Sequence, residues 1–137
     1  MELRAEAISR NYLRNGHGTN IFTAVLPVDF VLEEGKLTEI IGRSGSGKTT
    51  FIHMLAGLLT PSEGKVFLDG KDLYALPDEE RSFLRNRDVG IIPQGQSGLS
   101  SLTVLENVMA PASMYEKTEG KTEQAEELLS LVGIKEL

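Results

Sequence analysis

The 137-residue sequence contains no cysteine, no long apolar run and no excess of basic residues. Without cysteine the chain forms neither disulfides nor thiolate metal sites. Its first residues also lack an apolar signal core, so an intracellular, reducing compartment is expected. No apolar stretch approaches the roughly 18 residues of a membrane span, so any role at a membrane would be peripheral. The net charge of −6 argues against nucleic acid as a partner, because surfaces that bind DNA or RNA are normally basic.

What is present, 40% hydrophobic and 25% charged residues, indicates one globular domain with a small core. Hydrophobic patterning and turn residues predict strands at 3–9, 21–32, 37–41, 64–68 and 89–92, and helices at 48–59, 77–87, 102–109 and 122–131. The first two strands, joined by a turn-rich loop at 14–20, are expected to form an antiparallel hairpin. The strand at 37–41 runs into a glycine-rich loop and then into a helix with Phe51, Ile52, Leu55 and Leu58 near one face. This is the order of elements that a phosphate site requires.

The glycine-rich loop, GRSGSGKTTF at 42–51, contains the complete pattern Gly-x-x-x-x-Gly-Lys-Ser/Thr of a phosphate-binding loop. Its glycines let the backbone turn tightly and point successive N–H groups at phosphate oxygens, and the following helix adds the positive end of its dipole. Lys48 is expected to reach the β- and γ-phosphates, the Thr49 hydroxyl to bind Mg²⁺, and the Thr50 hydroxyl to lie on the α-phosphate side. The alternative, a glycine-serine loop with no ligand, is disfavoured because every pattern position and both flanks match.

Four segments, which together span nearly all of the chain, resemble the N-terminal part of an ATP-binding cassette (ABC) transporter nucleotide-binding domain. The stretch at 42–73 is similar to the phosphate loop, first helix and following turn of that family. VGIIPQ at 89–94 resembles the strand that leads to the family's Q-loop glutamine. SLTVLENV at 101–108 resembles the start of the helical subdomain, and SRNY at 9–12 is placed like the segment whose aromatic residue stacks on adenine.

The resemblance implies Mg-ATP as the ligand and gives roles to residues at matching positions. Tyr12 would stack on adenine, and Gln94 would complete the Mg²⁺ shell, contact the attacking water and relay the nucleotide state to the helical subdomain. The expected nucleotide-binding residues are Tyr12, Gly42, Ser44, Gly45, Ser46, Gly47, Lys48, Thr49 and Thr50, the expected catalytic residues Lys48 and Gln94, and the expected metal ligands Thr49 and Gln94. Two alternatives stay open: Tyr12 as a packing residue of the small sheet, and Gln94 as an ordinary loop amide.

The resemblance also implies a function: an ATP-binding subunit that couples ATP binding and hydrolysis to transport through a membrane permease. It would work beside a second nucleotide-binding domain on the cytoplasmic face of the membrane. The stretch at 91–108 resembles the exporter-type branch that serves lipoprotein or peptide and macrolide efflux. The alternative is a nucleotide-binding or regulatory module that never hydrolyses ATP. A GTPase or small-molecule kinase is disfavoured because the chain has no Asn-Lys-x-Asp element.

The sequence departs from the family in lacking the L-S-G-G-Q signature and the apolar strand followed by Asp-Glu that holds the metal and water. Apolar segments that run into acidic residues at 30–34 and 66–69 are not substitutes, because one precedes the phosphate loop and the other belongs to a hairpin turn. The chain is therefore expected to be a truncated domain that carries the ATP-binding half.

The expected fold is α/β, with a partial P-loop NTPase core of parallel strands, an antiparallel β-subdomain and the start of a helical subdomain. Within this single domain, residues 1–36 are mainly the β-subdomain, 37–94 the P-loop core segments and 95–137 the start of the helical subdomain. The strands at 37–41 and 89–92 would lack neighbours, and an exposed apolar edge of this kind favours marginal stability or self-association.

Overall fold

The computed structural model describes residues 1–14, 20–95, 97–115 and 120–134. The chain forms two compact units, Met1–Arg85 and Asn86–Leu137, and each is described by itself. None of the helices in these ranges combines the length and the apolar composition needed to cross a membrane.

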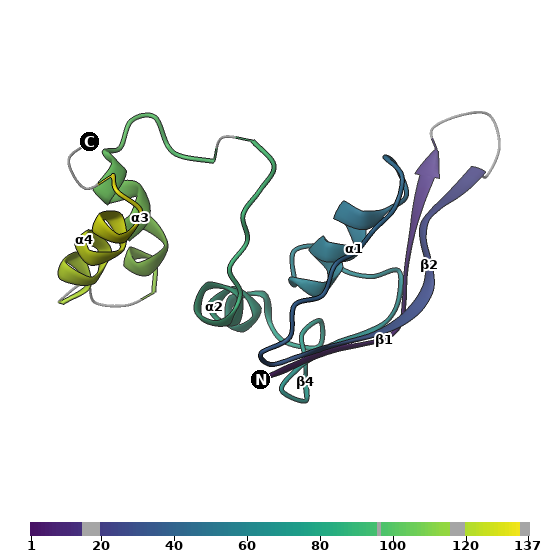
Figure 1. Ribbon diagram of the computed structural model, residues 1–137. Helices are drawn as coiled ribbons and strands as arrows, with labels where there is room; N and C mark the ends of the chain where they lie inside the picture. Colours follow the sequence, from purple (N-terminus) through teal and green to yellow (C-terminus); the bar gives the residue numbers. More distant parts are fainter. Residues whose placement is uncertain (15–19, 96, 116–119, 135–137) are drawn as a thin grey trace. The chain divides into compact units, whose positions relative to one another are not determined.

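The first unit is built on a four-stranded antiparallel sheet in the order β2-β1-β3-β4 (Figure 1). Its strands are β1 (Glu2–Arg14), β2 (Asn20–Glu33), β3 (Glu63–Leu68) and β4 (Lys71–Asp72). The predicted hairpin of the first two strands is confirmed, since β1 pairs antiparallel with β2 along its length. The chain turns after β2, where the Lys36 N–H donates to the Glu33 carbonyl at 3.2 Å.

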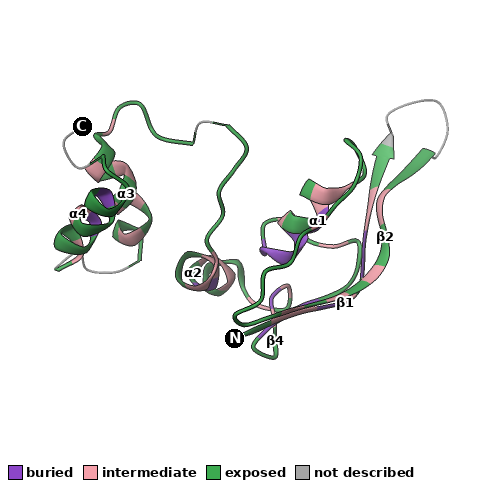
Figure 2. Cartoon of the chain, in the orientation of Figure 1, coloured by how far each residue is buried: buried purple, intermediate pink, exposed green. Residues whose placement is uncertain are grey.

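Helix α1 (Lys48–Leu55) packs on this sheet, and Figure 2 shows the buried positions on the helix and on the strands. The ring of Phe51 meets Phe30 of β2 edge to face, with centroids 5.4 Å apart. The core also contains Ala5, Ile8, Met54, Leu55, Val66, Leu68, Leu73 and Leu84. The last of these lies on α2 (Asp78–Asp88), whose first turn is acidic, as a helix N-terminus favours.

Helix α1 is shorter than predicted: it ends at Leu55, whereas the predicted end was Leu59. The chain leaves the helix through Gly57, whose positive φ of 73° ends helical geometry. As a result Leu58 leaves the predicted apolar face and is exposed, as is Ile52, whereas Met54 is fully buried.

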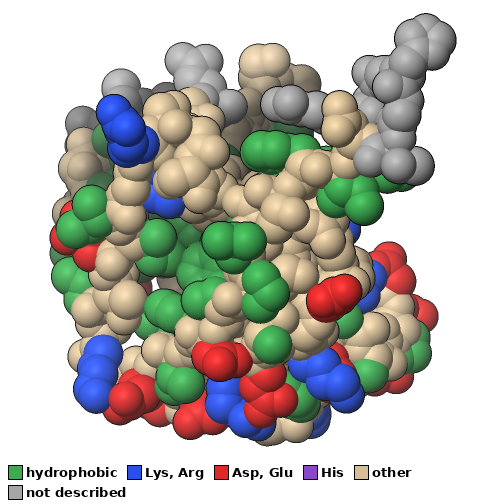
Figure 3. Space-filling view, turned by 90° about the vertical axis from the view of Figure 1, so that its right-hand side faces the viewer, with side chains coloured by type: hydrophobic (Ala, Val, Ile, Leu, Met, Phe, Trp, Pro, Cys, Tyr) green, Lys and Arg blue, Asp and Glu red, His purple; other side chains and the backbone are tan. Residues whose placement is uncertain are grey.

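The prediction of strands at 37–41 and 89–92 is wrong, because both segments are irregular. A β-strand exists only where a neighbour supplies hydrogen bonds, and no strand in the described part of the chain pairs with either segment. The described sheet is therefore entirely antiparallel. Several of their apolar side chains lie open, with Leu37 100%, Ile41 82% and Ile92 98% exposed, whereas Ile40 is partly buried against the core. Figure 3 shows that hydrophobic side chains are visible on one face of the molecule.

The second unit contains the helices α3 (Val104–Ser113) and α4 (Lys121–Leu131), which pack against each other (Figure 1). A capping box begins α3: the Glu106 N–H donates to the Thr103 hydroxyl, while the Glu106 carboxylate accepts from the Thr103 N–H. The Asn107 side chain accepts from the Leu99 N–H at 2.7 Å and donates to the carbonyl of Thr103 at 2.9 Å. These bonds fix the loop before α3.

The end of α1 is held by Tyr74, whose hydroxyl lies 2.7 Å from the carbonyl oxygens of both Met54 and Leu59 and shares its one proton between them. Burial raises the pKa of Tyr74 from 10 to about 12. The unfolded chain therefore loses this proton at lower pH than the folded chain, so the Tyr74 contribution is fully present below about pH 10 and is lost as the pH rises toward 12.

We expect Tyr74→Phe to lower the free energy of unfolding at neutral pH by about 1 kcal/mol, because one donor to buried carbonyls is removed. The difference between wild type and variant should shrink across the alkaline range. Urea unfolding at a series of pH values checks both effects, with Tyr12→Phe, a tyrosine 38% exposed, as the control. A difference that stays constant with pH would contradict the linkage.

The exposed segment at 37–41 predicts self-association of the chain at high concentration. We expect the double variant Leu37→Lys, Ile41→Lys to shift the sedimentation profile toward monomer without lowering the melting temperature, since neither side chain is buried. A wild-type chain that stays monomeric and melts cooperatively at high temperature would argue against this prediction.

Candidate functional site

The glycine-rich loop turns back on itself immediately before α1. Gly45 and Gly47 both have positive φ, 77° and 88°, and the Ser46 N–H donates to the Arg43 carbonyl at 3.2 Å. Helix α1 begins with no side-chain cap, because Gly47 occupies the N-cap position. No side-chain oxygen of the N-cap therefore accepts from the first N–H groups of α1. A helix start of this kind is well suited to bind an anion.

Lys48 folds back across the loop. Its Nζ donates to the carbonyl oxygens of Gly42 and Arg43, at 2.7 Å each, and lies 3.4 Å from the Ser46 hydroxyl oxygen. In the described part of the chain Lys48 bonds to carbonyl and hydroxyl oxygens and to no carboxylate, so its charge is not neutralised there. The loop thus encloses an ammonium group that can exchange neutral oxygens for charged ones.

The loop is seated directly on β2. A Cβ built on Gly47 would overlap the carbonyl oxygen of Ala24 and lie 3.2 Å from the Val25 Cγ2. The strand carries an extra residue at this point, since Arg10 pairs with Val25 but the next residue, Asn11, pairs with Thr23. Ala24 is therefore a bulge residue, and bulges re-aim the backbone of a strand. Only glycine combines this close approach with the positive φ.

A hollow of about 540 Å³ opens between β2 and the loop. Residues 22–26 of β2 form one side, Gly45 to Lys48 the other, and Phe51 of α1 also lines it. Pockets of this size hold small ligands such as nucleotides. The lining combines apolar side chains with the lysine and the loop backbone, which suits a ligand with an apolar ring and a charged end.

The other sequence-predicted residues lie in different parts of the molecule. Ser44 and Thr49 are exposed and Thr50 is half-buried, all in or just after the loop. Tyr12 lies on β1 opposite Phe22 of β2, which lines the hollow, and its ring is 38% exposed. Gln94 is exposed and belongs to the second unit.

Two contributors to the site were missed by sequence reasoning. Arg10 places its guanidinium 4.8 Å from the centre of the Tyr12 ring. The i, i+2 spacing indicates a shared face only on a strand, and the predicted strand ended at residue 9, whereas β1 continues to Arg14. Ala24 seats Gly47, but nothing in the sequence marks it, because the bulge depends on how two strands pair.

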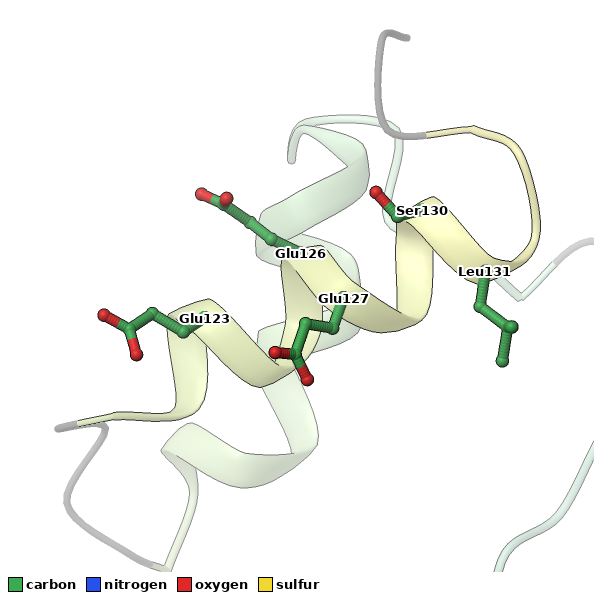
Figure 4. Close-up of a pocket in the computed structure, with 5 residues that line it drawn as sticks. All are labelled: Glu123, Glu126, Glu127, Ser130 and Leu131. Atoms are coloured by element: carbon green, nitrogen blue, oxygen red, sulfur yellow. The ribbon is translucent and has the colours of Figure 1, made fainter.

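The acidic residues that the structure describes form no metal-binding group with the loop. Asp69 lies in the β3–β4 turn, as predicted, where it accepts from the Glu2 N–H at 2.7 Å. A second hollow lies on α4, lined by Glu123, Glu126, Glu127, Ser130 and Leu131 (Figure 4). Its carboxylates would repel a phosphate. Among the described residues, no three Asp, Glu or His side chains are grouped to hold a metal ion.

The glycine-rich loop and the helix that begins with Lys48 carry the Gly-x-x-x-x-Gly-Lys-Ser/Thr pattern of the P-loop NTPase class. The sequence model of the ABC transporter family matches residues 25–137, which is more than half of the chain. The chain therefore belongs to the ABC transporter family, and the resemblance inferred from its motifs is confirmed.

Individual relatives agree with this assignment. Over 135 residues the chain is 38% identical to the lipoprotein-releasing system ATP-binding protein LolD of Shewanella frigidimarina, a match that covers 96% of the chain and 54% of that protein. Over 130 residues it is 42% identical to the methionine import ATP-binding protein MetN of Rhizobium meliloti, covering 94% of the chain and 36% of that protein. The chain spans about half the length of the LolD relatives it matches.

Solved structures confirm the fold class. A dimeric structure of the bacterial ABC transporter cassette MJ0796 superposes with a TM-score of 0.83 at 29% identity, covering 94% of this chain and 56% of that one. A post-hydrolysis structure of the same cassette bound to ADP and Pi gives a TM-score of 0.81 at 28% identity. The expected fold, a partial P-loop core with an antiparallel β-subdomain and the start of a helical subdomain, is confirmed at this level.

Gly47 packs so closely against the Ala24 carbonyl oxygen of β2 that an added Cβ would overlap it. We expect Gly47→Ala to lower the free energy of unfolding by about 2–4 kcal/mol, because backbone strain adds to the overlap with Ala24. The matched control is Gly35→Ala, whose φ is also positive, 72°, but whose Cβ would meet nothing within 4 Å. This control should cost about 1–2 kcal/mol. Urea unfolding of both variants measures the difference, and equal losses would contradict the steric argument.

Proposed function

We propose that the chain is the ATP-binding part of an ABC transporter ATPase subunit, which couples ATP binding and hydrolysis to transport through a membrane permease. The observation that carries the proposal is the position of Lys48, whose Nζ is held inside the loop by two carbonyl oxygens. The relatives' names support it, since LolD and MetN are both ATP-binding proteins.

The loop fits a phosphate chain. Uncapped N–H groups at the start of α1 and the Lys48 ammonium would bind phosphate oxygens, and charge-assisted bonds of this kind are stronger than those Lys48 makes to carbonyls. Gly42, Ser44, Gly45, Ser46, Gly47 and Thr50 would contribute the remaining loop contacts, and Tyr12 would stack on the adenine ring.

The residues also fit Mg²⁺, although in a limited way. Mg²⁺ bound with ATP neutralises charge on the phosphates, and it commonly takes only one or two protein ligands besides phosphate and water. The exposed Thr49 hydroxyl supplies one such ligand, and we assign the second to Gln94. These two residues, together with Lys48, are the proposed catalytic and metal-binding set of this chain.

A second candidate function is a nucleotide-binding module that does not hydrolyse ATP. It is favoured by one observation: the described residues hold a phosphate grip but no grouped carboxylates that would bind metal or position water. The two candidates differ in phosphate release and not in nucleotide affinity, so one experiment separates them.

The proposal extends to partners and location. A permease and a second nucleotide-binding domain are proposed as partners at the cytoplasmic face of the membrane, supported by the family and by the dimeric state of the MJ0796 structure. A cargo is not proposed, because a lipoprotein-releasing protein and a methionine importer match the chain at similar identity, 38% and 42%.

We expect Lys48→Ala to weaken Mg-ATP binding at least tenfold, because a charge-assisted contact to phosphate is worth about 1.5–3 kcal/mol. Calorimetric titration of Mg-ATP into the wild-type chain and the variant measures the effect, with phosphate release followed in the same samples. Lys71→Ala, on β4 and outside the loop, is the control and should bind as wild type does. Binding that is insensitive to Lys48 would overturn the proposed function, and Lys48-dependent phosphate release would exclude the second candidate.

A further inference from the structure

Arg10 is fixed in place on β1, two residues before Tyr12. One guanidinium nitrogen donates to the Thr60 carbonyl at 2.8 Å, and the guanidinium carbon lies 4.8 Å from the centre of the Tyr12 ring. Residues two apart on a strand share a face, and this contact shows that the two side chains do. Arg10 therefore packs against the ring that the proposed function assigns to adenine.

The strand around Arg10 is tied to the segment that follows α1. The Ser62 N–H donates to the Ser9 carbonyl at 2.8 Å, and the Asn11 N–H donates to the Ser62 hydroxyl at 3.0 Å. Together with the bond from Arg10 to Thr60, these contacts fasten the part of β1 before Tyr12 to the chain at 60–62. The Tyr12 ring is thus held by a rigid part of the unit that also carries α1 and the phosphate loop.

Arg10 differs from Arg4, the other arginine of β1 that lies over an aromatic ring, in having no acidic partner among the described residues. Arg4 lies 4.7 Å above the ring of Phe67, and it forms ion pairs with Glu2 and Glu6. Arg10 has the same geometry over an aromatic ring, but its described bonds go to a carbonyl, and its Nε is buried without a hydrogen-bond partner. A full positive charge therefore lies against the Tyr12 ring. Both residues are on β1, which pairs with β2, and β2 forms one side of the hollow.

We propose that Arg10 is a positioning residue for the nucleotide base. It holds the Tyr12 ring in one orientation by stacking on it, which reduces the side-chain ordering that base binding would otherwise require. This assignment of Arg10 rests on the proposed function, because the proposed function gives Tyr12 a base to stack on. Arg10 would be a specificity determinant outside the phosphate loop, and it would act on the base rather than on the phosphates.

The test compares two ligands that share phosphates but not a base. Mg-ATP and inorganic triphosphate with Mg²⁺ are titrated into the wild-type chain, Arg10→Met and Arg10→Lys. We expect Arg10→Met to weaken Mg-ATP binding about two- to fivefold, the range of an exposed cation–π contact, and to leave triphosphate binding unchanged. Arg10→Lys keeps the charge and should lie between wild type and Arg10→Met. In a Tyr12→Ala background, Arg10→Met should have no further effect on Mg-ATP.

Arg4→Met is the matched control, because it removes an equivalent cation–π pair from the same strand and should change neither titration. Equal losses for Mg-ATP and triphosphate in both Arg10 variants would overturn the assignment, since they indicate a phosphate contact or a loss of structure. Mg-ATP binding that is insensitive to Arg10 would also overturn it while leaving the proposed function intact. A wild-type chain that binds neither ligand would overturn the proposed function, and with it this assignment.

Discussion

The contact between Gly47 and the Ala24 carbonyl is the constraint on which the site depends. It brings the end of the phosphate loop against β2 so closely that no side chain fits between them. The bulge at Ala24 creates this seat, and the bulge exists because β2 carries one residue more than β1 between two paired positions. The phosphate loop is therefore positioned by the β-hairpin, although the two are separate in sequence.

Helix α1 depends on the same seat. With only eight residues it is too short to be stable alone, since isolated helices below about 12–15 residues are marginal in water. Tertiary contacts hold both ends. Phe51, near its start, packs on Phe30 of β2, and the Tyr74 hydroxyl bonds the carbonyl of Met54 near its end. Lys48 and Thr49 thus project from a helix whose direction is set by the sheet beneath it.

Sequence reasoning succeeded where the signal is local. The hairpin, the loop and the start of α1 follow from hydrophobic patterning and glycine spacing, which act within a few residues. The strand predictions at 37–41 and 89–92 were wrong, because apolar residues alone do not make a strand. The hydrogen bonds of a strand must come from a neighbouring strand. Arg10 was missed because the predicted strand stopped before it, at residue 9. Ala24 was missed because its bulge depends on how β1 and β2 pair, which neither strand specifies alone.

The described contacts of the glycine-rich loop lie within the first unit. In the described part of the chain the hydrogen bonds of the Lys48 side chain stay within residues 42–48, and Gly47 packs against the hairpin of the same unit. The phosphate binding proposed for this loop would therefore depend on one local segment and one strand. Hydrolysis needs a metal ligand and a group for water in addition, and Gln94, the described residue proposed for both, belongs to the other unit. Binding and turnover thus make different demands on the fold, and the residues proposed for phosphate binding all lie in the first unit.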